Sequence, residues 1–199
     1  MARAGWSYWA QPLPPYFSDA EYYDAAARSL ASGEGYSVLL TPEGFRPGGS
    51  ATAFFPPGYS LYLSAAYRLL GSTVASGRAA NILAGALTVP LVYLIGRRLF
   101  TPTHGLLAAA GAAVLPSLIF WTPVLLSETF FTFVFAAAVL LVLLTLGEDG
   151  RLSIRSAALA GLVVGLAALV RGQALVLLPV ALLWWRLSGA DTRSSLGAS

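Results

Sequence analysis

The chain has 199 residues, of which 57% are hydrophobic and only 11% are charged, and its mean hydropathy is +0.70. A soluble domain carries about 25% charged residues, so this composition excludes an ordinary water-soluble globule and indicates a protein whose solvent is lipid. The net charge is +3, but the basic residues are scattered arginines without a basic stripe, which argues against a nucleic-acid partner. The absence of cysteine and the single histidine, His104, exclude disulfides, thiolate metal sites and His-based relays within the sequence.

Residues 1–73 are polar, aromatic and rich in glycine and proline, and we expect them to form an extracytoplasmic segment. Residues 18–32 predict a short amphipathic helix with Asp19 and Glu21 in its first turn, where acids favour the helix dipole. Residues 35–50 are expected to be a loop. Residues 57–70 are apolar and aromatic but too short to span a bilayer, so we predict a helix at the membrane surface.

Residues 74–187 are expected to form a bundle of about five transmembrane helices, because five apolar stretches there approach the ~20 residues that a bilayer span needs. The stretches are residues 79–96, 105–121, 128–146, 156–170 and 174–187. The last two are short, so they form either a tight hairpin or two tilted spans. Pro90, Pro116 and Pro179 lie inside stretches and are expected to kink them. The sequence therefore predicts an all-α polytopic membrane protein, followed by a disordered tail over residues 188–199.

Arginines between the stretches predict the orientation in the membrane. Alternation of the spans brings one group of arginines to the same side, which the positive-inside rule assigns to the cytoplasm. This group is Arg97, Arg98, Arg151, Arg155 and Arg186. The opposite, extracytoplasmic side then receives residues 1–73 together with Arg78, Glu128 and Arg171. Most of the unusual polar residues are therefore expected on the outer face.

Two carboxylates on that face are candidates for catalysis. Asp19 could act as a general base that takes a proton from an acceptor hydroxyl, or it could only stabilise the start of its helix. Glu128 begins a helix in the run LLSETFFTFVF, which has no other charge. A carboxylate so near hydrocarbon is a functional hypothesis by default. The alternative is that Ser127 caps the helix and that lipid headgroups hydrate Glu128.

Arg171 interrupts the apolar segment GLAALVRGQALVLLP. Its guanidinium would suit bidentate binding of a lipid phosphate, although an interfacial arginine also reaches headgroups nonspecifically. Arg78, at the outer end of the first stretch, has the same two interpretations. Tyr59 closes the aromatic turn FFPPGY, which could line a sugar or lipid groove or could anchor the chain at the interface.

Five segments carry a family resemblance through their common order. They are SDAEYYDAAARSLASGEGY, FFPPGYSLYLSAAYRLLG, GRAANILAGALTVPLVYLIGRRLF, LSETFFTFVF and GLAALVRGQALVLLP. In this order the sequence, from about residue 18 to residue 187, resembles the GT-C glycosyltransferases. More narrowly, it is similar to the bacterial relatives of dolichyl-phosphate-mannose protein mannosyltransferases and of the aminoarabinose transferase that acts on lipid A. The resemblance implies a GT-C-like helical bundle in a bacterial plasma membrane, with an extracytoplasmic active face.

The resemblance also implies an activity: inverting transfer of a sugar from a polyprenyl-phosphate carrier to a lipid, glycan or protein acceptor. Asp19 matches the acid at the start of the family's first outer loop, and Glu128 matches a second acid that opens a later helix. Family members often have Asp-Glu in tandem, whereas here Glu21 comes one position later. Arg171 matches the basic residue that holds the carrier phosphate. The residues also assigned to phosphate or sugar binding are Arg78, Glu21 and Tyr59. The resemblance requires no cofactor and leaves a divalent metal as an open alternative.

Family members also have a transmembrane helix before the acidic loop and continue with more helices, so the sequence is expected to be the front part of such a core. Two other hypotheses stay open. The first is a membrane transport or binding subunit that uses Glu128 and Arg171 as a buried pair along a substrate path. The second is an inactive fragment or scaffold bundle. A transferase requires Asp19, Glu128 and Arg171 to converge on one outward cavity, whereas a transporter requires polar groups that face each other near mid-membrane.

Overall fold

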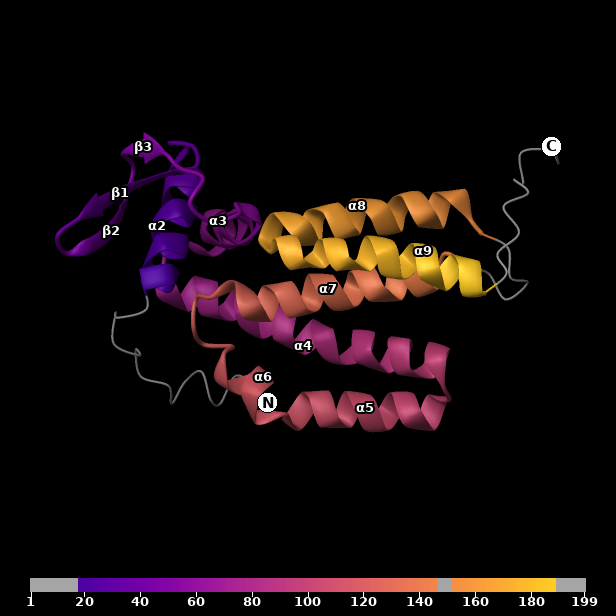
Figure 1. Cartoon of the computed structure of the whole chain (residues 1–199). Helices are drawn as coiled ribbons and strands as arrows, with labels where there is room; N and C mark the ends of the chain where they lie inside the picture. The colour runs from indigo at the N-terminus through magenta and orange to yellow at the C-terminus, as the bar shows by residue number, and fades with distance from the viewer. Residues whose placement is uncertain (1–17, 147–151, 189–199) are drawn as a thin grey trace.

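The structure, a computed structural model, describes residues 18–146 and 152–188, which are mostly helical (Figure 1). A bundle contains α4 (Val74–Leu99), α5 (Pro102–Val114), α7 (Ser127–Leu143), α8 (Ile154–Val170) and α9 (Leu177–Leu187). Helix α4 packs on α5 and on α7, and α7 packs on α8. Helices α2 (Ser18–Ser32) and α3 (Gly58–Leu70) and a small sheet lie together at one end of the bundle, here called the outer end.

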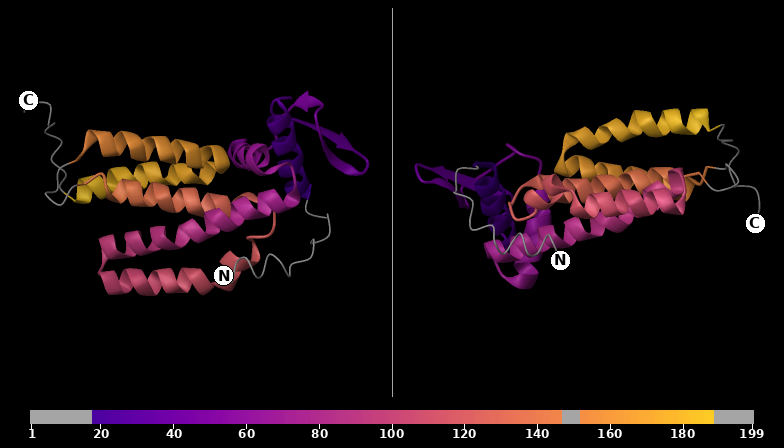
Figure 2. Two further views of the ribbon diagram at one scale, coloured as in Figure 1. Left: turned by 180° about the vertical axis from the view of Figure 1, so that it is seen from behind. Right: turned by 90° about the horizontal axis from the view of Figure 1, so that it is seen from below.

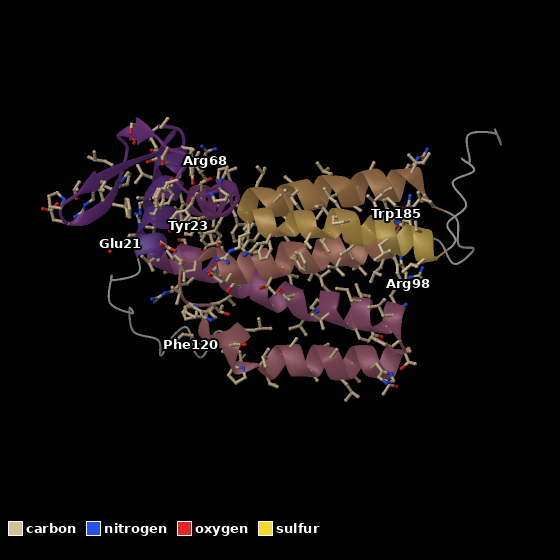
Figure 3. The ribbon with its side chains drawn as sticks, viewed as in Figure 1. Glu21, Tyr23, Arg68, Arg98, Phe120 and Trp185 are labelled. Atoms are coloured by element: carbon tan, nitrogen blue, oxygen red, sulfur yellow. The ribbon has the colours of Figure 1, made fainter. Side chains whose placement is uncertain are left out.

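The two ends of the bundle carry different side chains. Glu21 and Tyr23 lie at the outer end, whereas Arg98 and Trp185 lie at the opposite end, here called the far end (Figure 3). At the far end Arg98 donates to the carbonyl of Leu146, and the Trp185 indole donates to the buried Thr145 hydroxyl. The predicted membrane orientation places these two groups of residues on opposite sides of the membrane. Arg151 and the predicted disordered tail beyond Ser188 lie outside the described residues.

A three-stranded antiparallel sheet occupies residues expected to form a loop, so the all-α prediction is wrong in this segment. Its strands are β1 (Ser37–Thr41), β2 (Gly44–Pro47) and β3 (Ser50–Ala51), in the order β2-β1-β3. Gly44, with φ +119°, closes the turn between β1 and β2 in a conformation that only glycine adopts easily. The dense glycine and proline that indicated a loop are the turn residues of this sheet.

Helices α2 and α3 pack through aromatic and small side chains, with Tyr22, Tyr23, Tyr59 and Leu63 in the core. A polar network fixes the same pair of helices. The Tyr67 phenol donates to Asp24 at 2.5 Å, and Arg28 bonds the other carboxylate oxygen of Asp24 at 2.8 Å. Arg28 also donates to the carbonyl of Ser72, just before α4. The outer elements are therefore tied to the start of the bundle.

Helix α3 lies across the outer end of the bundle rather than along it (Figures 1 and 2). Its first residue, Gly58, touches the backbone at the end of α8. A β-carbon at Gly58 would lie 2.7 Å from the carbonyl carbon of Leu169 and 2.8 Å from the amide nitrogen of Val170. The absent side chain lets α3 approach α8 directly, one residue before Arg171.

Only part of the predicted set of spans has the expected length. Among the described residues, one helix, α4, is long and apolar enough to cross a bilayer. The second predicted stretch, residues 105–121, is divided because Pro116 begins the separate helix α6 (Pro116–Phe120). Leu115 is extended, as the residue before a proline tends to be, so α5 ends at Val114. Helices α7 and α8 have 17 residues each, or about 26 Å at 1.5 Å per residue, so five spans remain an expectation.

Candidate functional site

An ion pair joins two helix ends at the outer end of the bundle. Glu128 lies in the first turn of α7, and Arg171 follows the last residue of α8 with an extended backbone, before a short 3-10 helix, η1 (Gly172–Val176). Arg171 Nη2 donates to Glu128 Oε1 at 2.5 Å. Arg171 Nε donates to Ser127 Oγ at 2.9 Å, and the guanidinium carbon lies 6.0 Å from the Phe131 ring centroid. Three neighbours on α7 therefore hold the guanidinium.

The guanidinium of Arg171 keeps one edge for another ligand. Nε and Nη2 share an edge of the planar group, and Ser127 and Glu128 occupy that edge. Within the described residues no hydrogen bond involves Nη1, and the side chain is 33% exposed. The end of the fork between Nη1 and Nη2 has the geometry that binds two oxygens of a phosphate.

Tyr23 links α2 to this pair. Tyr23 is 5% exposed, and its phenol lies near Ser127. Burial raises the pKa of Tyr23, while the Ser127 hydroxyl and the Arg171 charge lower this pKa and the charges of Asp19 and Glu128 raise it. The Tyr23 phenol is therefore within electrostatic reach of all three charged groups. Asp19, one helical turn before Tyr23 on the same face of α2, is exposed.

The charges of Asp19, Glu128 and Arg171 all act on the pKa of the Tyr23 phenol, whereas Glu21 lies elsewhere. Glu21 lies against the sheet, since a β-carbon at Gly44 would lie 2.6 Å from Glu21 Oε2. The position follows from helical geometry, because two residues after Asp19 the side chain points to another face of α2.

Tyr59 and Arg78 support the loop that leads to Glu128. Tyr59 is fully buried, and its phenol donates to Asn81 Oδ1 at 3.1 Å, so the predicted contact with a sugar or lipid is replaced here by contacts inside the protein. The Asn81 amide in turn donates to the carbonyl of Val124 at 2.8 Å. Arg78 Nε donates to the carbonyl of Pro123 at 3.0 Å. These bonds fix the course of the chain just before α7.

Two residues of the site were not singled out from the sequence. Tyr23 was recognisable from its spacing, since it follows Asp19 by four residues and both must lie on one helix face. Ser127 was considered only as a helix cap, and that interpretation is wrong. The N-cap of α7 is Leu126, without a side-chain capping bond, and the Ser127 hydroxyl instead accepts from Arg171.

Glu128 also borders a cleft between α4, α6 and α7. The cleft is lined by Gly85, Thr88, Ser117, Leu118, Trp121, Glu128, Thr129 and Thr132. Glu128 Oε2 is buried and has no hydrogen-bond partner among the described residues, which is unfavourable for a carboxylate oxygen. A ligand hydroxyl or a water could satisfy it. The described residues contain no group of three or more His, Asp or Glu side chains arranged to hold a metal ion.

The fold and this cluster define a class of protein: a membrane helical bundle with an acid–arginine pair and a further acid at one end. The chain belongs to the dolichyl-phosphate-mannose-protein mannosyltransferase family, whose model matches residues 55–198. The family consists of integral membrane glycosyltransferases that use a polyprenyl-phosphate sugar donor. The match includes Glu128 and Arg171, while Asp19 and Tyr23 precede it. No curated protein and no solved structure matches the chain.

Proposed function

We propose that this membrane glycosyltransferase transfers a sugar from a polyprenyl-phosphate donor to an acceptor hydroxyl on the extracytoplasmic face of a bacterial plasma membrane. The observation that carries the proposal is the guanidinium of Arg171, which Ser127 and Glu128 hold on one edge while the other edge stays available. An arginine fixed in this way suits a phosphate that must be bound and then released as a leaving group.

The reaction is a single displacement. Asp19 accepts the proton of the acceptor hydroxyl, and the hydroxyl oxygen attacks the anomeric carbon from the face opposite the phosphate. The bond between the anomeric carbon and the phosphate oxygen breaks, and the phosphate leaves with the electron pair. Arg171 stabilises the additional negative charge on the phosphate. The anomeric configuration is inverted, and Asp19 later releases its proton to water.

Glu128 serves the donor in this proposal. Its Oε1 holds Arg171, and its unsatisfied Oε2 is suited to accept a hydrogen bond from a sugar hydroxyl. Arg78 and Tyr59 act indirectly through the loop before α7, and Glu21 acts from the sheet side of α2. The acceptor is a lipid, glycan or protein hydroxyl.

The transport hypothesis explains why Glu128 pairs with Arg171, but it does not explain why the pair lies at the outer end of the bundle. Both residues lie at helix ends, in the first turn of α7 and directly after α8. Their side chains are 40% and 33% exposed. A substrate path through the bilayer needs its charged pair inside the bundle, so the position at the outer end favours the transferase.

The test is transfer of radiolabelled mannose from polyprenyl-phosphate mannose in proteoliposomes. We expect Asp19→Asn to lose transfer while it still binds the donor, and Arg171→Ala to lose both. Glu43→Gln, in the exposed β1–β2 turn, and Arg186→Ala, at the far end, are the matched charge-removing controls. Equal transfer by all variants would exclude these roles, and no transfer by the unaltered chain would show that residues 1–199 are not catalytic alone.

A further inference from the structure

Ser127 is a buried polar residue at the junction of three elements. Its side chain is 0% exposed, although it is the first residue of α7. A serine at a helix start usually caps the helix by accepting from a backbone N–H. Here the N-cap is Leu126, and no side chain caps α7. Helix capping therefore does not account for a hydroxyl at this position.

The hydroxyl is instead engaged by a functional side chain. Its oxygen accepts from Arg171 Nε at 2.9 Å. Because the guanidinium can only donate, Ser127 acts as the acceptor in this bond. The hydroxyl therefore serves the side chain of Arg171, on another helix end, and not the backbone of its own helix.

The bond to Nε also fixes the rotation of the guanidinium. A single contact with Glu128 would leave Arg171 free to turn about the Nη2···Oε1 line. The second contact, with Ser127, defines the plane of the group and hence the direction of its Nη1–Nη2 edge.

We propose that Ser127 is a positioning residue, which directs the open edge of Arg171 towards a ligand phosphate. This inference rests on the proposed function, because the ligand is the phosphate of the donor lipid. Ser127 itself does not touch the ligand, since it is fully buried.

The experiment measures binding of radiolabelled, sugar-free polyprenyl phosphate to the full chain in nanodiscs. The Ser127→Ala variant loses one hydrogen bond to a charged group. We therefore expect it to bind polyprenyl phosphate about tenfold more weakly than the unaltered chain. Ser64→Ala removes a buried hydroxyl that, among the described residues, bonds only the carbonyl of Leu61 in its own helix, and this variant should bind like the unaltered chain. Ser127→Thr and Ser127→Val have the same shape and differ in the hydroxyl, so the threonine variant should bind more tightly than the valine variant whatever the packing cost.

A double-mutant cycle separates positioning from a general effect on folding. In an Arg171→Ala background, Ser127→Ala should cause no further loss, because the group that it positions is gone. Equal affinities of the Ser127→Ala variant and the unaltered chain, or of the threonine and valine variants, would overturn this inference alone. So would an undiminished effect of Ser127→Ala in the Arg171→Ala background. Unchanged binding by Arg171→Ala would overturn the proposed function itself.

Discussion

The side chains of Arg171 and Glu128 form an ion pair across 43 positions of sequence, between the start of one apolar helix and the end of another. Each residue lies where its helix meets the outer end, so the pair joins α7 to the α8–η1 junction. The pair orients a guanidinium whose other edge stays open, and it is the feature on which a phosphate-binding role depends.

Arg171→Lys tests whether geometry or charge matters at this position. A lysine ammonium cannot bond Ser127 and Glu128 along one edge and offer a second edge to a phosphate. We expect Arg171→Lys to weaken binding of polyprenyl phosphate at least about tenfold, despite the conserved charge. Arg186→Lys, in the last turn of α9, is the control. Binding by Arg171→Lys equal to that of the unaltered chain would mean that a point charge suffices.

Gly58→Ala tests the contact between α3 and the end of α8. The new methyl group would overlap the backbone at Leu169 and Val170, which cannot move aside as a flexible side chain can. We expect a loss of about 1–3 kcal/mol in stability, the usual cost of overpacking, seen as a lower Tm in detergent. At Gly161 and Gly165 no atom lies within 4 Å of the added carbon, so alanine there should not lower Tm. A Tm unchanged by Gly58→Ala would contradict the close contact.

Alkaline pH should destabilise the outer elements through Tyr62. Burial raises the pKa of Tyr62 from the ordinary 10.0 to about 12. Between these values the unfolded phenol loses its proton while the folded one keeps it, so stability falls as pH rises. Below pH 10 both states are protonated and this contribution is complete.

Thermal unfolding between pH 8 and pH 12 measures this effect. The slope of the unfolding free energy against pH reports how many more protons the folded state binds than the unfolded state. Above pH 10, Tyr62→Phe should reduce this number by up to one proton per molecule. At pH 8 the same variant loses the hydrogen bond from the phenol to the carbonyl of Ala80. The change in Tm that this loss causes at pH 8 serves as the internal control. Identical slopes above pH 10 would exclude Tyr62 as a contributor.

The predicted orientation can be tested by thiol labelling, because the chain has no cysteine of its own. Glu43→Cys lies in the β1–β2 turn at the outer end, and Thr103→Cys lies at the start of α5, beyond the arginines that end α4. We expect a membrane-impermeant maleimide to label Glu43→Cys in intact cells and Thr103→Cys only after lysis. Labelling of both in intact cells would contradict the orientation.

Sequence patterns were most informative where local chemistry decides the structure. The bounds of α2 follow from a polar helical segment ended by Gly33, and α4 follows from one long apolar run between arginines. The sheet was missed because its strands are short and only Ser37 and Val38 in β1 are buried, which leaves little alternation to detect. Pro116 divided a helix that hydropathy alone made continuous.

The candidate site was predictable residue by residue but not as an arrangement. Asp19, Glu128 and Arg171 are recognisable because charges are rare in an apolar sequence. The role of Ser127 is not, because its hydroxyl meets Arg171 only after α7 and α8 have packed. Tyr59 shows the opposite case: an aromatic residue suited to a sugar surface is used inside the protein, where its phenol finds Asn81.

The loop before α7 is held through its main chain. Arg78 and Asn81 both bond to peptide carbonyls, those of Pro123 and Val124, rather than to side chains. A carbonyl is present whatever the residue, so these bonds do not restrict the identity of positions 123 and 124. Substitutions at these two buried positions therefore leave both hydrogen bonds in place, so the chain keeps its course towards Glu128.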